Sequence, residues 1–155
     1  MKRFHMNVKV SDLQKSTEYY SSLFAAKPSL EKDDYVKWML DDPFINFSIE
    51  PTGGETGIAH VGLQAENEAE LQEVFSRVGE AGGPTFDEGE TTCCYAHSEK
   101  SWTRDPDGLI WETFFTDGQV TQYGAPPDIA KVNEGADCCI PSERPKPKSA
   151  PDRCC

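Results

Sequence analysis

The sequence predicts an α+β fold in which two βαβββ modules, at about residues 1–52 and 57–117, face each other across a cleft or partial barrel. Three observations support this prediction. Both halves open with alternating apolar and polar residues, which is typical of a half-buried strand. Each half then carries one amphipathic helical segment, and each closes with stretches that suit β-strands. The helices are expected to cover the outer faces of the curled sheets.

The first half shows this order most clearly. Residues 4–10 alternate as a strand, and Ser11 or Asp12 can then cap a helix that runs to about Phe24. The turn Asp41–Asp42–Pro43 separates the last two strand segments. The strands after the helix are expected at a weak segment, 27–32, and at the stronger segments 35–40 and 44–50.

The second half repeats the order 55 residues later, when His60 is aligned with His5. Its helix is expected from about Asn67 to Glu80, where the Gly82–Gly83–Pro84 segment ends it. The turn 105–108 (DPDG) then joins two strands in a hairpin. The strands of this half are expected at residues 91–97, 101–104 and 109–115, after an opening strand around His60.

The end of the chain has a different composition. Residues 118–155 are rich in proline, hold four of the six cysteines and contain few large apolar residues. Such a segment cannot bury enough surface to offset the entropy of ordering it. We therefore expect one folded domain, residues 1–117, followed by a mostly disordered tail.

Charge and cysteine usage restrict the partners and the compartment. The chain has 27 acidic and 15 basic residues, a net charge of −12, which argues against nucleic acid and anionic membranes as partners. No stretch approaches the roughly 20 apolar residues of a membrane span. The cysteines form adjacent pairs, unlike a secreted disulfide framework, so a cytoplasmic location is expected. The pairs are Cys93–Cys94, Cys138–Cys139 and Cys154–Cys155.

Two histidines and one carboxylate form a candidate metal site. His5 and His60 take the same position in the first strands of the two halves, on the polar face of each strand. Glu112 interrupts an apolar strand, where an unpaired carboxylate is costly to bury. Two histidines and one carboxylate leave coordination positions open and suit a non-haem Fe(II) site that uses O2, although Zn, Mn and Co also bind such a set.

The first half leaves a second ligand arrangement open. The position equivalent to Glu112 falls near Phe47, which is no ligand. A slip in strand register would bring Glu50 to the site as a fourth ligand. Four protein ligands would favour a Zn or Ni site of the hydrolase or isomerase type.

The dithiol Cys93–Cys94 is a candidate site for soft, thiophilic centres. Adjacent side chains on a regular strand point to opposite faces, so both sulfurs reach one target only at a bulge or a strand end. The pairs in the tail, Cys138–Cys139 and Cys154–Cys155, could capture such ions and pass them to the cleft.

These motifs carry a family resemblance over about residues 3–117. The paired βαβββ pattern and the phrase SWTRDPDGLIWETF resemble the vicinal oxygen chelate superfamily, which includes glyoxalase I, extradiol dioxygenases and bleomycin-resistance proteins. FHMNVKVSDL at the start, combined with ETTCCYA, resembles more narrowly the Fe(II)-dependent carbon–arsenic lyases and the related cadmium-induced proteins.

The resemblance implies a role for each of five residues. His5, His60 and Glu112 would hold one Fe(II), and Cys93 and Cys94 would bind trivalent arsenic. The implied activity is a dioxygenase-type lyase reaction. It uses O2 as co-substrate and cleaves the carbon–arsenic bond of trivalent organoarsenicals, such as methylarsonous acid or trivalent aromatic arsenicals. The reaction would release arsenite and serve arsenic detoxification. The segment after the dithiol, residues 96–101, would be a lid over the substrate.

Other readings remain open at the level of sequence. The chain could sequester cadmium or arsenite through its thiols without turnover, or act as a glyoxalase-like Zn or Ni isomerase. The intact ligand set argues against a metal-free drug-binding module. The two modules can pair within one chain or between the chains of a homodimer. The sequence does not distinguish methyl from aromatic arsenicals.

Overall fold

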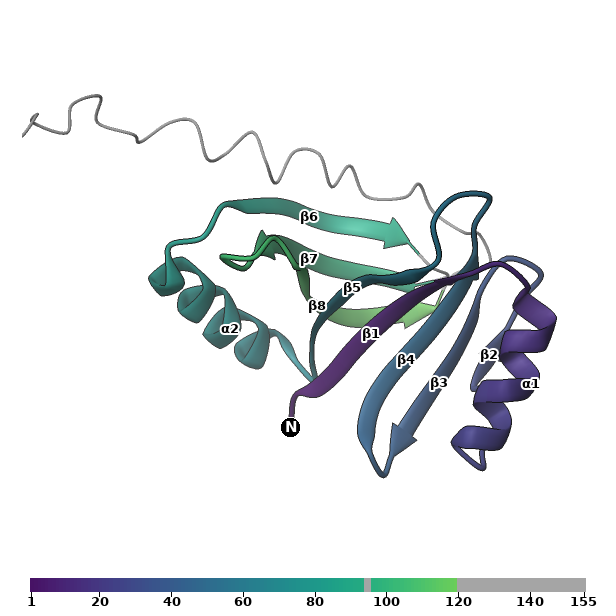
Figure 1. The fold of residues 1–155 in the computed structure, drawn as a ribbon. Helices are drawn as coiled ribbons and strands as arrows, with labels where there is room; N and C mark the ends of the chain where they lie inside the picture. Colours follow the sequence, from purple (N-terminus) through teal and green to yellow (C-terminus); the bar gives the residue numbers. More distant parts are fainter. Residues whose placement is uncertain (94–95, 120–155) are drawn as a thin grey trace, which may run out of the picture.

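The computed structural model describes residues 1–93 and 96–119, with the backbone alone at 90–93, 96–97 and 117–119. These residues form a single mixed sheet with two helices (Figure 1). The elements are β1 (Arg3–Val10), α1 (Leu13–Leu23), β2 (Leu30–Glu31), β3 (Val36–Asp41), β4 (Phe44–Pro51), β5 (Gly57–Ala65), α2 (Glu68–Ala81), β6 (Thr85–Cys93), β7 (Ala96–Arg104) and β8 (Ile110–Gln119).

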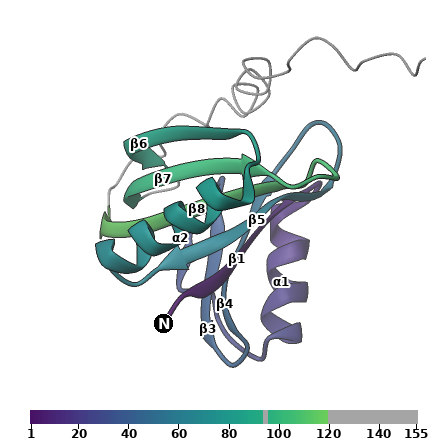
Figure 2. The same cartoon turned by 90° about the vertical axis from the view of Figure 1, so that its left-hand side faces the viewer.

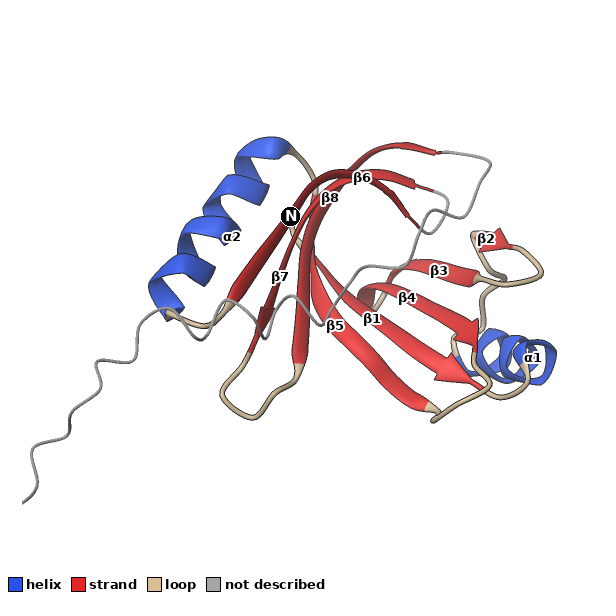
Figure 3. Cartoon of the chain, turned by 90° about the horizontal axis from the view of Figure 1, so that it is seen from above, coloured by secondary structure: helices blue, strands red, loops and turns tan. Residues whose placement is uncertain are grey.

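The order of the eight strands, β2-β3-β4-β1-β5-β8-β7-β6, confirms the two βαβββ modules. In each module the first strand pairs in parallel with the last, β1 with β4 and β5 with β8. The modules join through the antiparallel pair β1 and β5, so both belong to one sheet of one chain. Figure 3 shows the sheet as an open curl, with α1 and α2 on its outer side.

Both helices begin and end as the sequence predicts. Asp12 caps α1 by accepting a hydrogen bond from the Lys15 amide, and Asn67 caps α2 in the same way through the Glu70 amide. Gly82 ends α2 in the left-handed conformation, with a φ of 71°. Figure 2 shows α2 lying across β5 and β8, the strands it contacts. Within the described residues no helix is long and apolar enough to cross a membrane.

The core of the first module lies between α1 and the outer face of its strands. Trp38, Phe47 and Ile49 are buried there. Tyr20 and Phe24 of α1 contact the Phe47 ring, with ring centroids 4.6 and 5.2 Å apart. Phe47 therefore faces away from the inner side of the sheet, and the residues on either side of it in β4 face inward.

The hairpin of the second module differs from the prediction. The strand expected at 91–97 is wrong, because this segment spans the end of β6, the connection and the start of β7. The segment 96–101, expected as a lid, is instead part of β7, which pairs with both β6 and β8. β6 begins at Thr85 and contains a register shift between Asp87 and Gly89, where Gly89 has a φ of 69°. Glycine and acidic residues are uncommon in strands, and the bulge interrupts the alternation of apolar and polar residues. The sequence therefore does not predict the start of β6 at Thr85.

The end of the folded part also differs slightly from the expected segment. The last strand, β8, extends to Gln119 rather than 115. Residues 120–155 lie outside the described residues, and with them the predicted disorder and the cysteine pairs of the tail.

Gly62 is required by the close approach of β5 and β8. A Cβ on this residue would overlap with the carbonyl oxygen of Glu112 and lie 3.2 Å from the Glu112 Cβ. Replacing Gly62 by alanine should therefore lower the free energy of unfolding by roughly 1–3 kcal/mol, as overpacking does elsewhere. Gly79→Ala is the matched control, because a Cβ there meets nothing within 4 Å. Urea unfolding curves that place both variants at equal stability would contradict this packing.

Candidate metal centre

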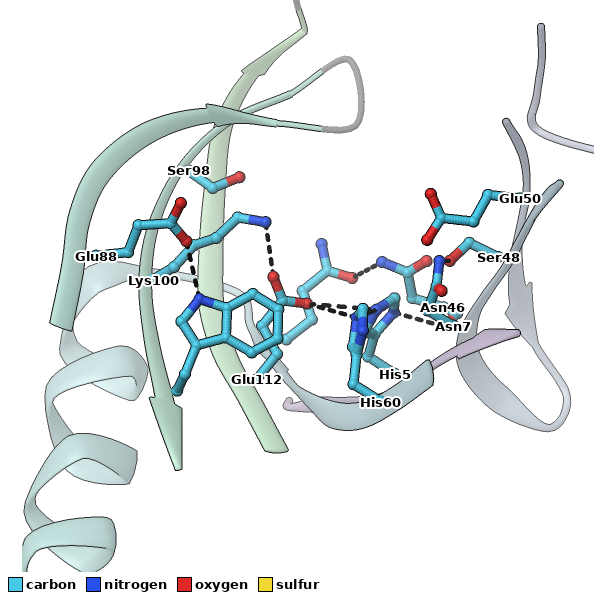
Figure 4. Close-up of polar contacts among 12 residues, drawn as sticks. His5, Asn7, Asn46, Ser48, Glu50, His60, Glu88, Ser98, Lys100 and Glu112 are labelled. Carbon is cyan, nitrogen blue, oxygen red and sulfur yellow. Dashed lines mark hydrogen bonds and ion pairs between the residues drawn. The ribbon is translucent and has the colours of Figure 1, made fainter. Parts of the chain in front are cut away.

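Three neighbouring strands at the junction of the modules bring the predicted ligands together. In register, His5 of β1 is opposite Gly62 of β5, which is in turn opposite Glu112 of β8. His60 lies two residues from Gly62 on β5, on the same face of the sheet. Figure 4 shows the two imidazoles and the carboxylate pointing toward one another.

The three side chains form a compact, buried cluster. Glu112 Oε2 lies 3.3 Å from His5 Nε2 and 3.4 Å from His60 Nε2, and the two Nε2 atoms are 3.1 Å apart. His5 and Glu112 are only 4% and 3% exposed. Among the described residues, these three form the one group whose ligand atoms could hold a metal ion together.

His5 is fixed in the tautomer that a metal requires. Its Nδ1 lies 2.9 Å from the backbone oxygen of Asn46. Because a carbonyl oxygen only accepts, Nδ1 carries the proton and donates it, which leaves the lone pair on Nε2 facing the cluster. Burial lowers the pKa of His5 to about 4, so the ring is neutral at neutral pH.

Lys100 keeps the carboxylate of Glu112 charged. Burial alone would raise the pKa of Glu112, but the Lys100 ammonium and the imidazole of His60 hold this pKa below its usual range. Lys100 Nζ donates to Glu112 Oε1 at 2.6 Å and leaves Oε2 to the histidines. Lys100 is not among the residues predicted from the sequence. Lys100 lies two residues before Trp102 and shares its face of β7. This pattern could predict Lys100 only if the bounds of β7 were known.

Aromatic rings form the walls of the centre. Trp102 lies edge-on to the ring of His60, with centroids 5.1 Å apart, and Phe114 lies edge-on to His5 at 5.2 Å. Trp102 Nε1 donates to Glu88 at 2.8 Å, which fixes the indole. These contacts hold both imidazoles in place and limit the access of water.

Glu50, the expected fourth ligand, takes another place. Its carboxylate forms an ion pair with Lys9 Nζ at 2.6 Å, and it is not part of the ligand cluster among the described residues. The position equivalent to Glu112 is Ser48 rather than Phe47. Ser48 is opposite Asn7 of β1, just as Glu112 is opposite Gly62 of β5. Asn7 lies two residues after His5, and Gly62 lies two residues after His60.

Of the dithiol, the structure describes only the backbone of Cys93. Cys93 is the last residue of β6 and is opposite Ala96, the first residue of β7. Lys100 lies four positions after Ala96 on β7, a path of about 14 Å along the strand. Cys94 and the side chain of Cys93 lie outside the described part of the structure, so their predicted role in binding arsenic stays a prediction.

The side chains fit a divalent cation. They offer a neutral imidazole with a directed lone pair, a second imidazole and a carboxylate kept anionic in a buried place. The fold and the cluster together define the class of this protein: two paired βαβββ modules with a candidate metal centre at their junction.

Comparison with known proteins identifies the family. The family model described as the Glyoxalase/Bleomycin resistance protein/Dioxygenase superfamily matches residues 2–113. The chain belongs to this superfamily.

Individual relatives and one solved structure show similarities within and beyond the superfamily model. The chain is 40% identical over 151 residues to a trivalent organoarsenical cleaving enzyme of Bacillus sp. (strain MD1), with 92% of both chains covered. It is 29% identical over 142 residues to the cadmium-induced protein CadI of Mycobacterium bovis, covering 90% of this chain and 93% of the relative. Homoprotocatechuate 2,3-dioxygenase from Arthrobacter globiformis shares the fold, with a TM-score of 0.56 and 20% identity over 76% of this chain and 38% of that chain.

Removing the Lys100 charge tests the electrostatic balance of the centre. In metal-free protein, Lys100→Met leaves Glu112 buried without its ammonium partner and should lower the free energy of unfolding by roughly 3–5 kcal/mol. A divalent cation replaces the lost charge, so saturating Co(II) should raise the melting temperature more in the variant than in the wild type. Thermal unfolding with and without Co(II) measures both effects.

The control is Lys9→Met, because Lys9 forms its ion pair with Glu50 away from the cluster and is partly exposed. Partly exposed pairs contribute little to stability. Equal stability of Lys100→Met and Lys9→Met, with equal responses to Co(II), would show that Lys100 does not balance Glu112.

Proposed function

We propose that the chain is an Fe(II)- and O2-dependent lyase that cleaves the carbon–arsenic bond of trivalent organoarsenicals and releases arsenite. The observation that carries the proposal is the buried His5, His60 and Glu112 cluster in a chain 40% identical to an organoarsenical cleaving enzyme over nearly its whole length. Membership of the superfamily supports the fold, and the name of the relative supports trivalent organoarsenicals as the substrate class.

The donor set supports iron. Two imidazoles and one carboxylate, with no fourth ligand in the cluster among the described residues, leave coordination positions open for exchangeable ligands. When bound, Fe(II) would supply the redox chemistry with O2. The protein holds the ligands for it: Asn46 orients His5, Lys100 orients Glu112, and Trp102 packs against His60.

The dithiol suits the substrate. A trivalent organoarsenical carries one carbon substituent and two exchangeable positions on arsenic, and two thiolates satisfy both positions. Cys93 and Cys94 would thereby fix the arsenic and orient its carbon bond, a gain from positioning. The hairpin supports this division of work, because Cys93 ends β6 while β7, its partner strand, carries Lys100 and Trp102 into the metal centre.

The overall reaction balances with O2 as the oxidant. The carbon–arsenic bond breaks, the carbon fragment leaves oxidised, and arsenic leaves as arsenite. For methylarsonous acid, one O2 would give arsenite and formaldehyde with no other reactant. For a trivalent phenylarsenical, one O2 and one water would give arsenite and a dihydroxybenzene. A cytoplasmic location and a homodimer stay predictions from the sequence.

A second candidate function is thiol-based sequestration of cadmium or arsenite without turnover. The similarity to the cadmium-induced protein CadI favours it among the alternatives. The glyoxalase-like Zn or Ni isomerase has less support, because Glu50, its proposed fourth ligand, forms an ion pair with Lys9.

The proposal predicts catalytic, O2-dependent release of arsenite. The protein is reconstituted anaerobically with Fe(II) and given methylarsonous acid or trivalent phenylarsenical, with and without O2, and the arsenic species are separated and quantified. Several turnovers per chain with O2 and none without are expected. Tight binding of arsenic with no release would assign the chain to sequestration.

Variants separate the metal from the dithiol. Glu112→Ala should lose iron and reduce turnover to background while still binding arsenic, because the thiols are untouched. Cys93→Ser and Cys94→Ser should keep iron and lose arsenic binding. Glu50→Gln is the matched carboxylate control and should retain both, because Glu50 lies outside the cluster. Loss of iron from both classes of variant would refute this division of roles.

A further inference from the structure

The two modules contribute unequal pairs of residues to the metal centre. Asn7 and Ser48 are opposite each other in the parallel pair β1–β4, and Gly62 and Glu112 are opposite each other in the parallel pair β5–β8. Asn7 lies two residues after His5, just as Gly62 lies two residues after His60. The pseudo-twofold symmetry of the modules therefore makes Asn7 the counterpart of Gly62, and Ser48 the counterpart of Glu112.

This inequality explains why the cluster has three ligands. In one row across the sheet, His5 and Glu112 are separated by Gly62, which has no side chain, and their ligand atoms lie 3.3 Å apart. In the mirrored row, the residue between His60 and Ser48 is Asn7, which does have a side chain. The serine is also too short to replace a glutamate. The first module thus presents polar groups in place of a second carboxylate.

Asn7 and Ser48 form a buried pair with unused hydrogen-bonding capacity. They are 2% and 0% exposed, and Asn7 Nδ2 donates to Ser48 Oγ at 3.0 Å. Asn7 Oδ1 is buried and has no hydrogen-bond partner among the residues that the structure describes. An unpaired buried acceptor is costly, and a serine hydroxyl that accepts a hydrogen bond can also donate its own proton. Figure 4 shows the pair on the side of the imidazoles away from Glu112.

We propose that Asn7 and Ser48 would hydrogen-bond to a water-sized, exchangeable oxygen ligand of a metal held by His5, His60 and Glu112. Asn7 Oδ1 accepts from that ligand when it is water, and the Ser48 hydroxyl can donate to one that carries no proton. The pair keeps its side of the metal free of a protein ligand. This inference rests on the metal centre of the proposed function, and it assigns two further positioning residues to it.

The test builds the missing pair into the first module. Asn7→Gly combined with Ser48→Glu copies Gly62 and Glu112, and the probe for the open side is nitric oxide added to the anaerobic Fe(II) protein. Wild-type protein should bind nitric oxide and give the electron paramagnetic resonance signal of the iron complex. The double variant should keep one iron per chain, bind Co(II) at least tenfold more tightly and lose most of the nitric oxide signal. Asn7→Gly alone controls for the added carboxylate: it should still bind nitric oxide, but with a changed spectrum because the Asn7 acceptor is lost.

A second variant tests the hydrogen bonds without adding a ligand. Asn7→Leu keeps the volume but removes the acceptor and the donor to Ser48. Its iron content should stay at one per chain, while the spectrum of the nitric oxide complex changes. An unchanged spectrum would overturn the role of Asn7 whether or not the double variant folds.

The outcomes separate the two proposals. Full nitric oxide binding and unchanged Co(II) affinity in folded double variant would refute this inference alone, and the lyase could still stand. A wild-type chain that binds no divalent metal would refute the metal centre itself. Wild-type turnover with unaltered spectra in both variants would uphold the proposed function and refute the role of Asn7 and Ser48.

Discussion

The pairing of β1 with β5 is the constraint on which the rest of the structure depends. This antiparallel pair joins the two modules into one sheet and places the residues of their first strands side by side. His5 and His60 come from equivalent positions of these strands, so the symmetry that joins the modules also brings the imidazoles together. Gly62 then lets β8 approach closely enough for Glu112 to reach both rings. One backbone arrangement therefore creates both the fold and the candidate metal centre.

Charge balance explains the surroundings of the centre. A buried carboxylate is costly without compensation, and here it faces two imidazoles and one ammonium group. Lys100 Nζ binds Glu112 Oε1, and the two histidines face Glu112 Oε2. Glu112 Oε2 is therefore already oriented to bind a cation in the cluster. The hairpin that carries Lys100 also ends at Cys93.

The sequence predicted the parts of the site that repeat. His5 and His60 were found because two similar strands place histidine at the same position, and Glu112 because a carboxylate interrupts an apolar strand. Ser48 was missed because a prediction one residue off, at Phe47, moves a side chain to the opposite face of a strand. Lys100 was missed because the bulge at Gly89 obscured β6, which misplaced the bounds of β7. Non-local register and bulges determine these positions, and local periodicity does not report them.

The most direct test of the account is X-ray absorption at the iron edge of the anaerobic Fe(II)-loaded chain. The account predicts a first shell of nitrogen and oxygen ligands, with the scattering of two imidazoles and no sulfur, because the metal lies on His5, His60 and Glu112. A first shell with sulfur at about 2.3 Å, a typical metal–thiolate distance, would place the metal on the cysteines instead. That result would contradict the separation of metal centre and dithiol on which the proposed lyase depends.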